Sequence, residues 1–120
     1  MAVGDITYTN KGGNEPFSAI ATGSLIVDAD AAANIICGFH PSRVELIIQD
    51  ANGVETLAIW TNSMTSGHYL SIKSHADTQV TIPTSLGVVV YTGTDGLGFT
   101  IPANQTDVAD SDVIHWTAFR

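Results

Sequence analysis

Short runs of β-forming residues, separated by turn residues roughly every ten positions, constrain the fold of this chain more than any other feature. Along runs such as DITYTN and YLSIKSH, apolar and polar side chains alternate with a period of two, whereas the spacing of an amphipathic helix is hard to find. We count about eight or nine such runs. The pattern therefore predicts an all-β, antiparallel β-sandwich with a jelly-roll-like arrangement.

The chain length favours a single domain, because 120 residues can form one core and the sequence contains no internal repeat or linker. We assign residues 15–120 to the β-sandwich. The segment KGGNEP before Phe17 has the glycine and proline content of a turn. Residues 1–14 are therefore interpreted as a possible N-terminal arm that lies across a neighbour. The one stretch with helical character is DADAAAN, residues 28–34, which is long enough for a turn or two.

The segment from Gly38 to Thr61 predicts a β-hairpin whose apolar residues do not keep to one face. Asn52-Gly53 tolerates the positive φ angles of a tight turn and separates the two strands. A strand of an antiparallel sandwich is expected to have one polar face, but here both faces carry large aliphatic side chains. The second apolar face is covered either by another part of this chain or by another subunit. The candidate interface residues are Ile47 together with Leu57 and Ile59, or else Trp60 on the opposite face of the second strand.

The charge composition excludes two classes of partner. Four Lys and Arg residues stand against twelve acidic residues, which gives a formal net charge of -8. Nucleic acids and anionic membranes are bound by clustered cations, and four scattered cations cannot form such a cluster. Only 13% of the residues are charged, compared with about 25% in typical soluble domains. Small polar residues or other protein chains must therefore cover much of the surface.

The N-terminal residues lack the basic start and apolar run of a signal peptide, and no run reaches the roughly twenty apolar residues of a membrane span. We therefore expect synthesis in a cytoplasm and a soluble protein. Cys37 is the only cysteine and lies between Ile36 and Gly38-Phe39. Without a neighbouring cation to lower its pKa, it is predicted to be a buried apolar residue instead of a reactive thiol.

No spacing of residues in the sequence indicates a catalytic site or a zinc site. The histidines form no close pair of the kind that binds zinc, and the sequence lacks a nucleophile elbow, a phosphate-binding loop and any cofactor motif. A hydrolase would have to use His68 or His75, and we predict no enzymatic activity. The four histidines are His40, His68, His75 and His115.

Acidic clusters supply the better candidate for a metal site. The segment TDVADSD places Asp107, Asp110 and Asp112 within six residues, and Asp28 and Asp30 lie two apart. Calcium binds six to eight oxygen ligands, which such a loop can supply in part. The spacing does not match the EF-hand loop, so solvated turn aspartates are the alternative interpretation.

Two patterns in the sequence resemble a known class of proteins. One is GFHPSRVELI, residues 38–47, with the form Gly-Phe-x-Pro-x-x-Val; the other is GLGFTIPANQTDVADSDVIHWTAFR, residues 96–120. Together they cover about a third of the chain and are similar to small virion proteins of tailed bacteriophages, namely head decoration (cement) proteins and β-rich modules of tail fibres. The residues have structural roles by their chemistry: close backbone approach at Gly38 and Gly98, core filling by Phe39 and Phe99, a strand start set by Pro41, and an anchor at Trp116.

The resemblance implies a non-enzymatic decoration protein that binds the outer surface of the capsid and stabilises the head. Its partners would be the major capsid protein and two further copies of itself in a homotrimer. It would be made in the cytoplasm of the host bacterium and end on the outside of the virion. The alternative is a tail-fibre or receptor-binding module that recognises a host surface glycan. In such a module, exposed aromatic residues would stack on the sugar rings, and the candidates are Trp60, Tyr69 or Tyr91.

Overall fold

The computed structural model describes residues 4–10, 20–50, 53–73, 79–85, 87–103 and 108–120. All regular structure in these ranges is β-strand. The strands are β1 Ile6–Asn10, β2 Ile20–Ile26, β3 Ala33–Ile36, β4 Arg43–Asp50, β5 Gly53–Thr61, β6 Leu70–Lys73, β7 Gln79–Thr81, β8 Val89–Gly93, β9 Gly96–Ile101 and β10 Val113–Phe119.

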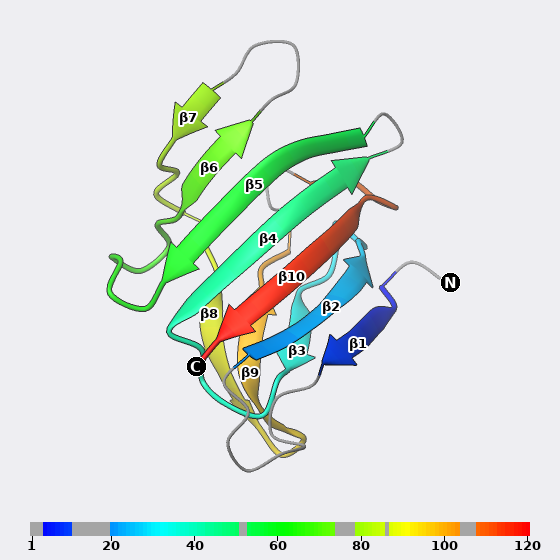
Figure 1. The fold of residues 1–120 in the computed structure, drawn as a ribbon, viewed down its shortest axis with the longest axis vertical. Helices are drawn as coiled ribbons and strands as arrows, with labels where there is room; N and C mark the ends of the chain where they lie inside the picture. The colour runs from blue at the N-terminus through cyan, green and yellow to red at the C-terminus, as the bar shows by residue number, and fades with distance from the viewer. Residues whose placement is uncertain (1–3, 11–19, 51–52, 74–78, 86, 104–107) are drawn as a thin grey trace.

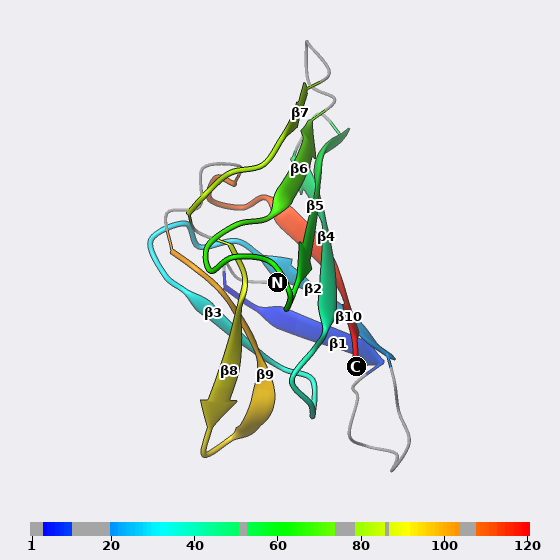
Figure 2. The same cartoon turned by 90° about the vertical axis from the view of Figure 1, so that its left-hand side faces the viewer.

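The strands form two antiparallel sheets that face each other. The larger sheet has the order β1-β2-β10-β4-β5-β6-β7, and the smaller has the order β3-β9-β8 (Figure 1). Figure 2 shows that the small sheet lies over the lower part of the large sheet, while β6 and β7 extend beyond it. The predicted all-β class, the antiparallel pairing and the single domain are confirmed.

The central hairpin forms as its sequence predicts. Strand β4 ends at Asp50 and β5 begins at Gly53, which has a φ angle of 121° and pairs with Asp50. The two residues between them, 51–52, lie outside the described residues. The register shifts after Ile48, because Ile48 pairs with Thr56 and the next residue pairs with Val54. This β-bulge sets which residues of β5 point into the core.

The core lies between the inner faces of the two sheets, with Trp116 of β10 near its centre. Its ring makes edge-on contacts with Tyr8 of β1 and with Phe99 of the small sheet, in each case with 5.7 Å between ring centroids. Tyr8 also accepts a hydrogen bond from the backbone N–H of Ile36 at 3.0 Å, which ties β1 to β3. Through these ring contacts, Trp116 connects β10 with β1 at the edge of the large sheet and with β9 of the small sheet.

Gly23 makes room for that ring. A Cβ atom at this position would meet the backbone oxygen of Thr7 and lie 2.5 Å from Cζ2 of Trp116. Gly98 has a similar role in the small sheet, where a Cβ atom would meet the carbonyl oxygen of Ile35. Both positions require the close backbone approach that only glycine allows.

The other residues of the two sequence patterns occupy the junction between β3 and β4. Gly38 has a φ angle of 90°, and its N–H donates to Leu97 O at 2.9 Å. Phe39 is 3% exposed, and Pro41 is buried just before β4. Phe99, which lies on β9 and not in this junction, is fully buried. The Arg120 guanidinium lies 5.7 Å from the centroid of the Phe39 ring, so the chain end covers this side of the core.

Two segments differ from a simple sequence interpretation. Residues 28–34 form no helix: Asp28 accepts from the Asp30 N–H at 3.2 Å in a turn, and β3 begins at Ala33, which pairs with Ile101 in the small sheet. Within the suggested arm, Ile6–Asn10 forms β1 of the large sheet, and just before it the Gly4 N–H donates to Ile26 O at 2.6 Å. Residues 1–3 and 11–14 of the suggested arm lie outside the described residues.

Candidate interaction surface

The outer face of the large sheet changes from polar to apolar along a single cross-strand row. Strand register brings one residue from each of six neighbouring strands into line. Two of these residues are polar and four are aliphatic, and the change occurs between β10 and β4. In sheet order the row is Ser24, His115, Ile47, Leu57, Ile72 and Val80.

A second row on the same face repeats this division. Thr22, Thr117 and Glu45 occupy the side of β2, β10 and β4, and are followed by Ile59 and Leu70 on β5 and β6. Residues two apart on one strand lie about 7 Å apart on the same face, and neighbouring strands lie about 4.8 Å apart, so the apolar side chains of the two rows are neighbours. We call the set the outer apolar patch: Ile47, Leu57, Ile59, Leu70, Ile72 and Val80.

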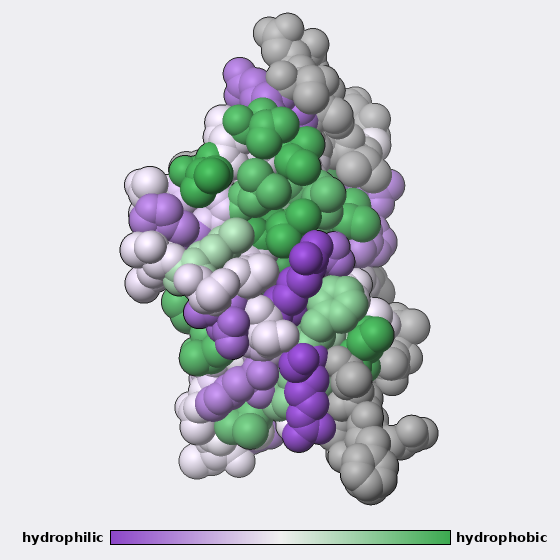
Figure 3. Space-filling view, turned by 60° about the vertical axis from the view of Figure 1, so that its left-hand side comes forward, coloured by the Kyte–Doolittle hydropathy of each residue, from purple (hydrophilic) through white to green (hydrophobic). Residues whose placement is uncertain are grey.

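The most exposed members of the outer apolar patch are Ile47 at 41% and Val80 at 65%. Its other four residues are half-buried, and Ile82, which follows β7, is 64% exposed. Figure 3 shows a continuous hydrophobic area on this face, with hydrophilic side chains beside it. The six residues contain no ionisable group. The nearest charges in the register belong to Glu45 and to Arg43, whose Nη2 lies 3.2 Å from Glu45 Oε1.

In the hairpin of β6 and β7, polar side chains lie on the inner side and apolar side chains on the outer side, the reverse of a usual sandwich strand. Register places Ser71, Lys73, Gln79 and Thr81 on the side that is continuous with the core-facing residues of β5. Leu70, Ile72 and Val80 consequently point to the opposite, outer side. In an antiparallel sandwich the face toward the core is normally the apolar one. This reversal is what extends the outer apolar patch to the edge of the sheet.

The structure places three of the four predicted interface residues together and separates the fourth. Ile47 pairs directly with Leu57, and Ile59 lies two residues along the same face. Trp60 instead pairs with Val44 and is 7% exposed, so it lies on the inner face, and its assignment to this surface was wrong. The sequence interpretation also missed Leu70, Ile72 and Val80. Their alternation was visible in the sequence, but the face they occupy depends on pairing with β5.

The aromatic residues considered for glycan stacking are mostly buried. Trp60 and Tyr69 are 7% and 2% exposed, which contradicts their use as exposed stacking platforms. Tyr91 is half-buried on β8, and its hydroxyl donates to Asp95 Oδ1 at 2.9 Å. This hydrogen bond raises the pKa of the Tyr91 hydroxyl.

The described histidines do not come together. His40 Nε2 lies 2.7 Å from Thr92 Oγ1, His68 Nδ1 lies 3.4 Å from Ser66 O, and His115 Nε2 lies 3.0 Å from Gln49 Oε1. His75 lies outside the described residues. Each described ring is thus hydrogen-bonded at a different place in the fold.

The acidic loop before β10 uses its carboxylates to bind backbone groups. Asp110 Oδ1 accepts from the Ala29 N–H at 2.7 Å, and Asp112 Oδ2 accepts from the Ala109 N–H at 2.9 Å. Asp107 lies outside the described residues. Within the ranges that the structure describes, no group of three or more acidic, His or Cys side chains has a metal-binding arrangement. The loop therefore fastens the β2–β3 connection to the start of β10.

Cys37 is buried, as predicted, with no measurable exposure. Its thiol donates to Phe39 O at 3.2 Å. Burial raises the pKa of the Cys37 thiol above its ordinary range, because the thiolate would lose its hydration. The group therefore stays neutral in the folded protein under conditions where an exposed thiol ionises.

The raised pKa of the Cys37 thiol predicts that the protein loses stability at alkaline pH. An unfolded cysteine ionises near pH 8.5, whereas the folded one retains its proton to a higher pH. Above about pH 8.5 the unfolded state therefore binds fewer protons than the folded state, and the free energy of unfolding falls by up to about 1.4 kcal/mol per pH unit. Urea unfolding between pH 7 and 10 measures this slope. Cys37→Ala removes the thiol, so an equal slope in that variant would contradict the prediction.

Comparisons of the chain with protein-family models, with curated proteins and with solved structures found no match. The part of the chain that the structure describes contains no helix that could span a membrane.

Proposed function

We propose that this protein is a non-enzymatic decoration protein that binds the outer surface of a bacteriophage capsid as a homotrimer and stabilises the head. The observation that supports it best is the outer apolar patch, which leaves Ile47 and Val80 in contact with solvent on the outer face of the large sheet. Large aliphatic residues on an outer sheet face cost solubility unless another surface covers them. A subunit or shell interface supplies that cover.

The charge distribution also supports a protein interface here. Two copies of a chain with a net charge of -8 repel each other wherever their carboxylates approach. The outer apolar patch contains no carboxylate, so two copies can meet there without bringing like charges into direct contact. Interfaces between identical subunits are more apolar at their centres than the rest of the surface. The patch has this composition, with the Arg43–Glu45 pair at its margin.

We further propose that the fold is a variant of the jelly roll. The last two strands are nested among the early ones: β10 lies between β2 and β4 in one sheet, and β9 lies beside β3 in the other. The chain thus changes sheet from β2 to β3 and from β3 to β4, and again on either side of the pair β8 and β9. It departs from regular jelly-roll connectivity at β4 and β5, which form a hairpin within one sheet.

The glycan-binding alternative has less support. Of the three aromatic residues that it requires, Trp60 and Tyr69 are buried and Tyr91 is bound to Asp95. Stacking on a sugar ring needs an exposed aromatic face. The apolar character of the outer apolar patch comes from aliphatic side chains, which favour a protein surface over a carbohydrate.

Rebinding to capsids tests this function. Heads stripped of the protein should take up the purified chain at a fixed ratio to the major capsid protein and become more resistant to heat. We expect the Val80→Glu variant to rebind about tenfold or more weakly if the patch contributes to the shell or trimer contact. Thr117→Glu adds the same charge on the polar side of the same face and should rebind as the wild type does.

The result that would contradict the proposed function is an absence of saturable uptake by stripped heads together with selective binding on a glycan array. Equal rebinding by Val80→Glu and the wild type would retain the function but remove the outer apolar patch from the contact.

A further inference from the structure

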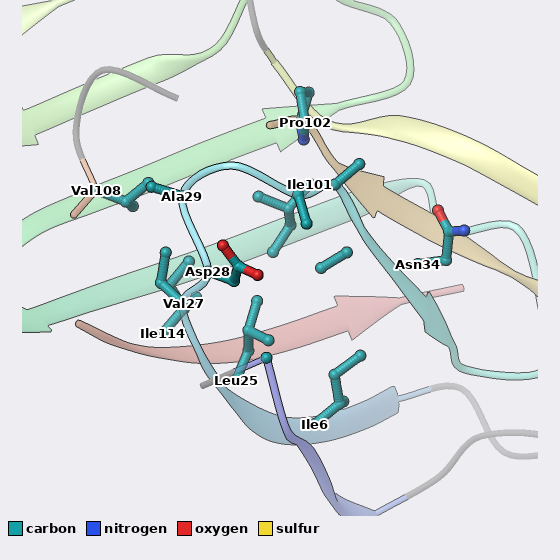
Figure 4. Close-up of a pocket in the computed structure, with 14 residues that line it drawn as sticks. Ile6, Leu25, Val27, Asp28, Ala29, Asn34, Ile101, Pro102, Val108 and Ile114 are labelled. Carbon is teal, nitrogen blue, oxygen red and sulfur yellow. The ribbon is translucent and has the colours of Figure 1, made fainter. Parts of the chain in front are cut away.

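A cavity of about 200 Å³ opens between the two sheets at the end opposite the C-terminus. Its floor is formed by the buried side chains of Leu25, Val27 and Ile114 of the large sheet, and Ile101 of the small sheet closes one side. Figure 4 shows these side chains around the open space, with Asp28 among them. The floor is aliphatic, so this part of the cavity fits an apolar body, while Asp28 and Asn34 make part of the lining polar.

The cavity exists because the residues above it are small. The turn from β2 to β3 places four alanines along the lining: Ala29, Ala31, Ala32 and Ala33. Elsewhere the space between the sheets is filled by large buried side chains such as Trp116 and Phe99. A cavity of about 150 Å³ with aliphatic walls is large enough to hold benzene. A ligand of five or six carbon atoms therefore fits this space.

Strand pairing concentrates negative charge around the mouth. The starts of β1 and β10 lie beside the end of β2, since the Ile26 N–H donates to Asp5 O and the Val27 N–H donates to Asp112 O. This end of the sheet consequently carries five carboxylates: Asp5, Asp28, Asp30, Asp110 and Asp112. Of the described cations, Arg43 and Arg120 lie at the opposite end of β10, and Lys73 lies in the same cross-strand row as Ile114 but three strands away from β10, on β6. The field at the mouth favours a cation.

Asp28 is the carboxylate that lines the cavity itself. Its Oδ1 accepts one backbone hydrogen bond from Asp30 at 3.2 Å. A carboxylate has about four acceptor positions on its two oxygens, so one such bond leaves capacity for a ligand. The other polar lining side chain, Asn34, accepts from Thr100 Oγ1 at 2.7 Å and is thereby held toward β9. The cavity thus combines an apolar floor with one acidic side chain, Asp28, among its described lining residues.

We propose that this cavity binds an alkylammonium group, with the carbon chain against Leu25, Val27 and Ile114 and the ammonium on the Asp28 carboxylate. The ligand comes from one of two sources, a free primary amine or the lysine side chain of another protein. The site is separate from the outer apolar patch, which lies on the other face of the large sheet. Its existence does not depend on the proposed capsid role.

Titration of the full chain with pentylammonium, followed by methyl NMR, tests the proposal. We expect a Kd on the order of 1 mM, as befits a ligand of six heavy atoms. The methyl signals of Ile114, Leu25 and Val27 should shift, whereas those of Ile59 and Leu70 on the outer face should not. Pentanoate has the same number of carbon atoms but a negative head, and should bind at least about tenfold more weakly.

Two variants separate the charge from the cavity. Asp28→Asn keeps the acceptor for the Asp30 N–H and should weaken pentylammonium binding about tenfold. Asp95→Asn removes the same charge at the β8–β9 turn and should leave the affinity unchanged. Ala33→Leu fills the cavity from β3 and should abolish the shifts; if that variant does not fold, Ala29→Leu is used instead.

Capped lysine, Nα-acetyl-lysine methylamide, distinguishes the two sources. Binding of both compounds assigns the site to a lysine side chain of a partner, and binding of pentylammonium alone assigns it to a free amine. Absence of shifts with both compounds, or equal affinity for pentylammonium and pentanoate, would overturn the proposal.

Discussion

Replacing Ile47 and Val80 together with glutamate is expected to raise the dissociation constant of the oligomer at least about 100-fold. Both side chains are exposed in the single chain, at 41% and 65%, so the substitution does not disturb the core. In an assembled interface the two carboxylates would lose their hydration beside aliphatic side chains without a compensating cation. Sedimentation equilibrium over a range of protein concentrations measures the change.

A matched control adds the same charge to the same face. Ser24→Glu with Thr117→Glu places two carboxylates on β2 and β10, at the polar side of the cross-strand rows. We expect this double variant to assemble as the wild type does. Equal weakening by both pairs would show that overall charge, and not the outer apolar patch, controls assembly.

Gly23→Ala is expected to lower the free energy of unfolding by about 3 kcal/mol or more. The added methyl would lie 2.5 Å from Cζ2 of Trp116 and would also meet the backbone oxygen of Thr7. Relief requires either β1 to separate from β2 or the Trp116 ring to leave its position between Tyr8 and Phe99. Thermal unfolding should show a melting temperature lower by at least about 10 °C.

The neighbouring residue supplies the comparison. Ser24 points to the outer face, and Ser24→Ala should change the stability by less than about 0.5 kcal/mol. A Gly23→Ala variant as stable as Ser24→Ala would mean that β1 is not held against β2 and Trp116 as described. That outcome would restore the interpretation of residues 1–14 as an arm separate from the domain.

The sequence predicted the hairpin of β4 and β5 because its signals are local. Alternation places Ile47 opposite Val44 and Leu46, and Asn52-Gly53 predicts a tight turn. In the structure the turn is displaced by one residue, because Gly53 already belongs to β5 and pairs with Asp50. The sequence could not decide which face of β5 is inside, since both faces carry large apolar residues. In the structure, the bulge after Ile48 determines which residues of β5 point inward, and Trp60 is one of them.

Contacts between strands that are distant in the sequence could not be predicted in the same way. The acidic mouth of the cavity depends on β10 lying between β2 and β4, a pairing that no turn signal encodes. The reversed polarity of β6 and β7 likewise depends on which side of β5 they continue. Alternating residues such as Leu70 and Ile72 identify a strand, but only the sheet register turns them into a surface.

Native mass spectrometry of the wild-type protein tests the central claim most directly. If the outer apolar patch is a subunit interface, the dominant species should have three times the 12.6 kDa mass of the chain, and the Ile47→Glu, Val80→Glu variant should have the mass of one chain. A wild-type protein that remains a monomer at every concentration up to those of a virion surface would contradict the claim.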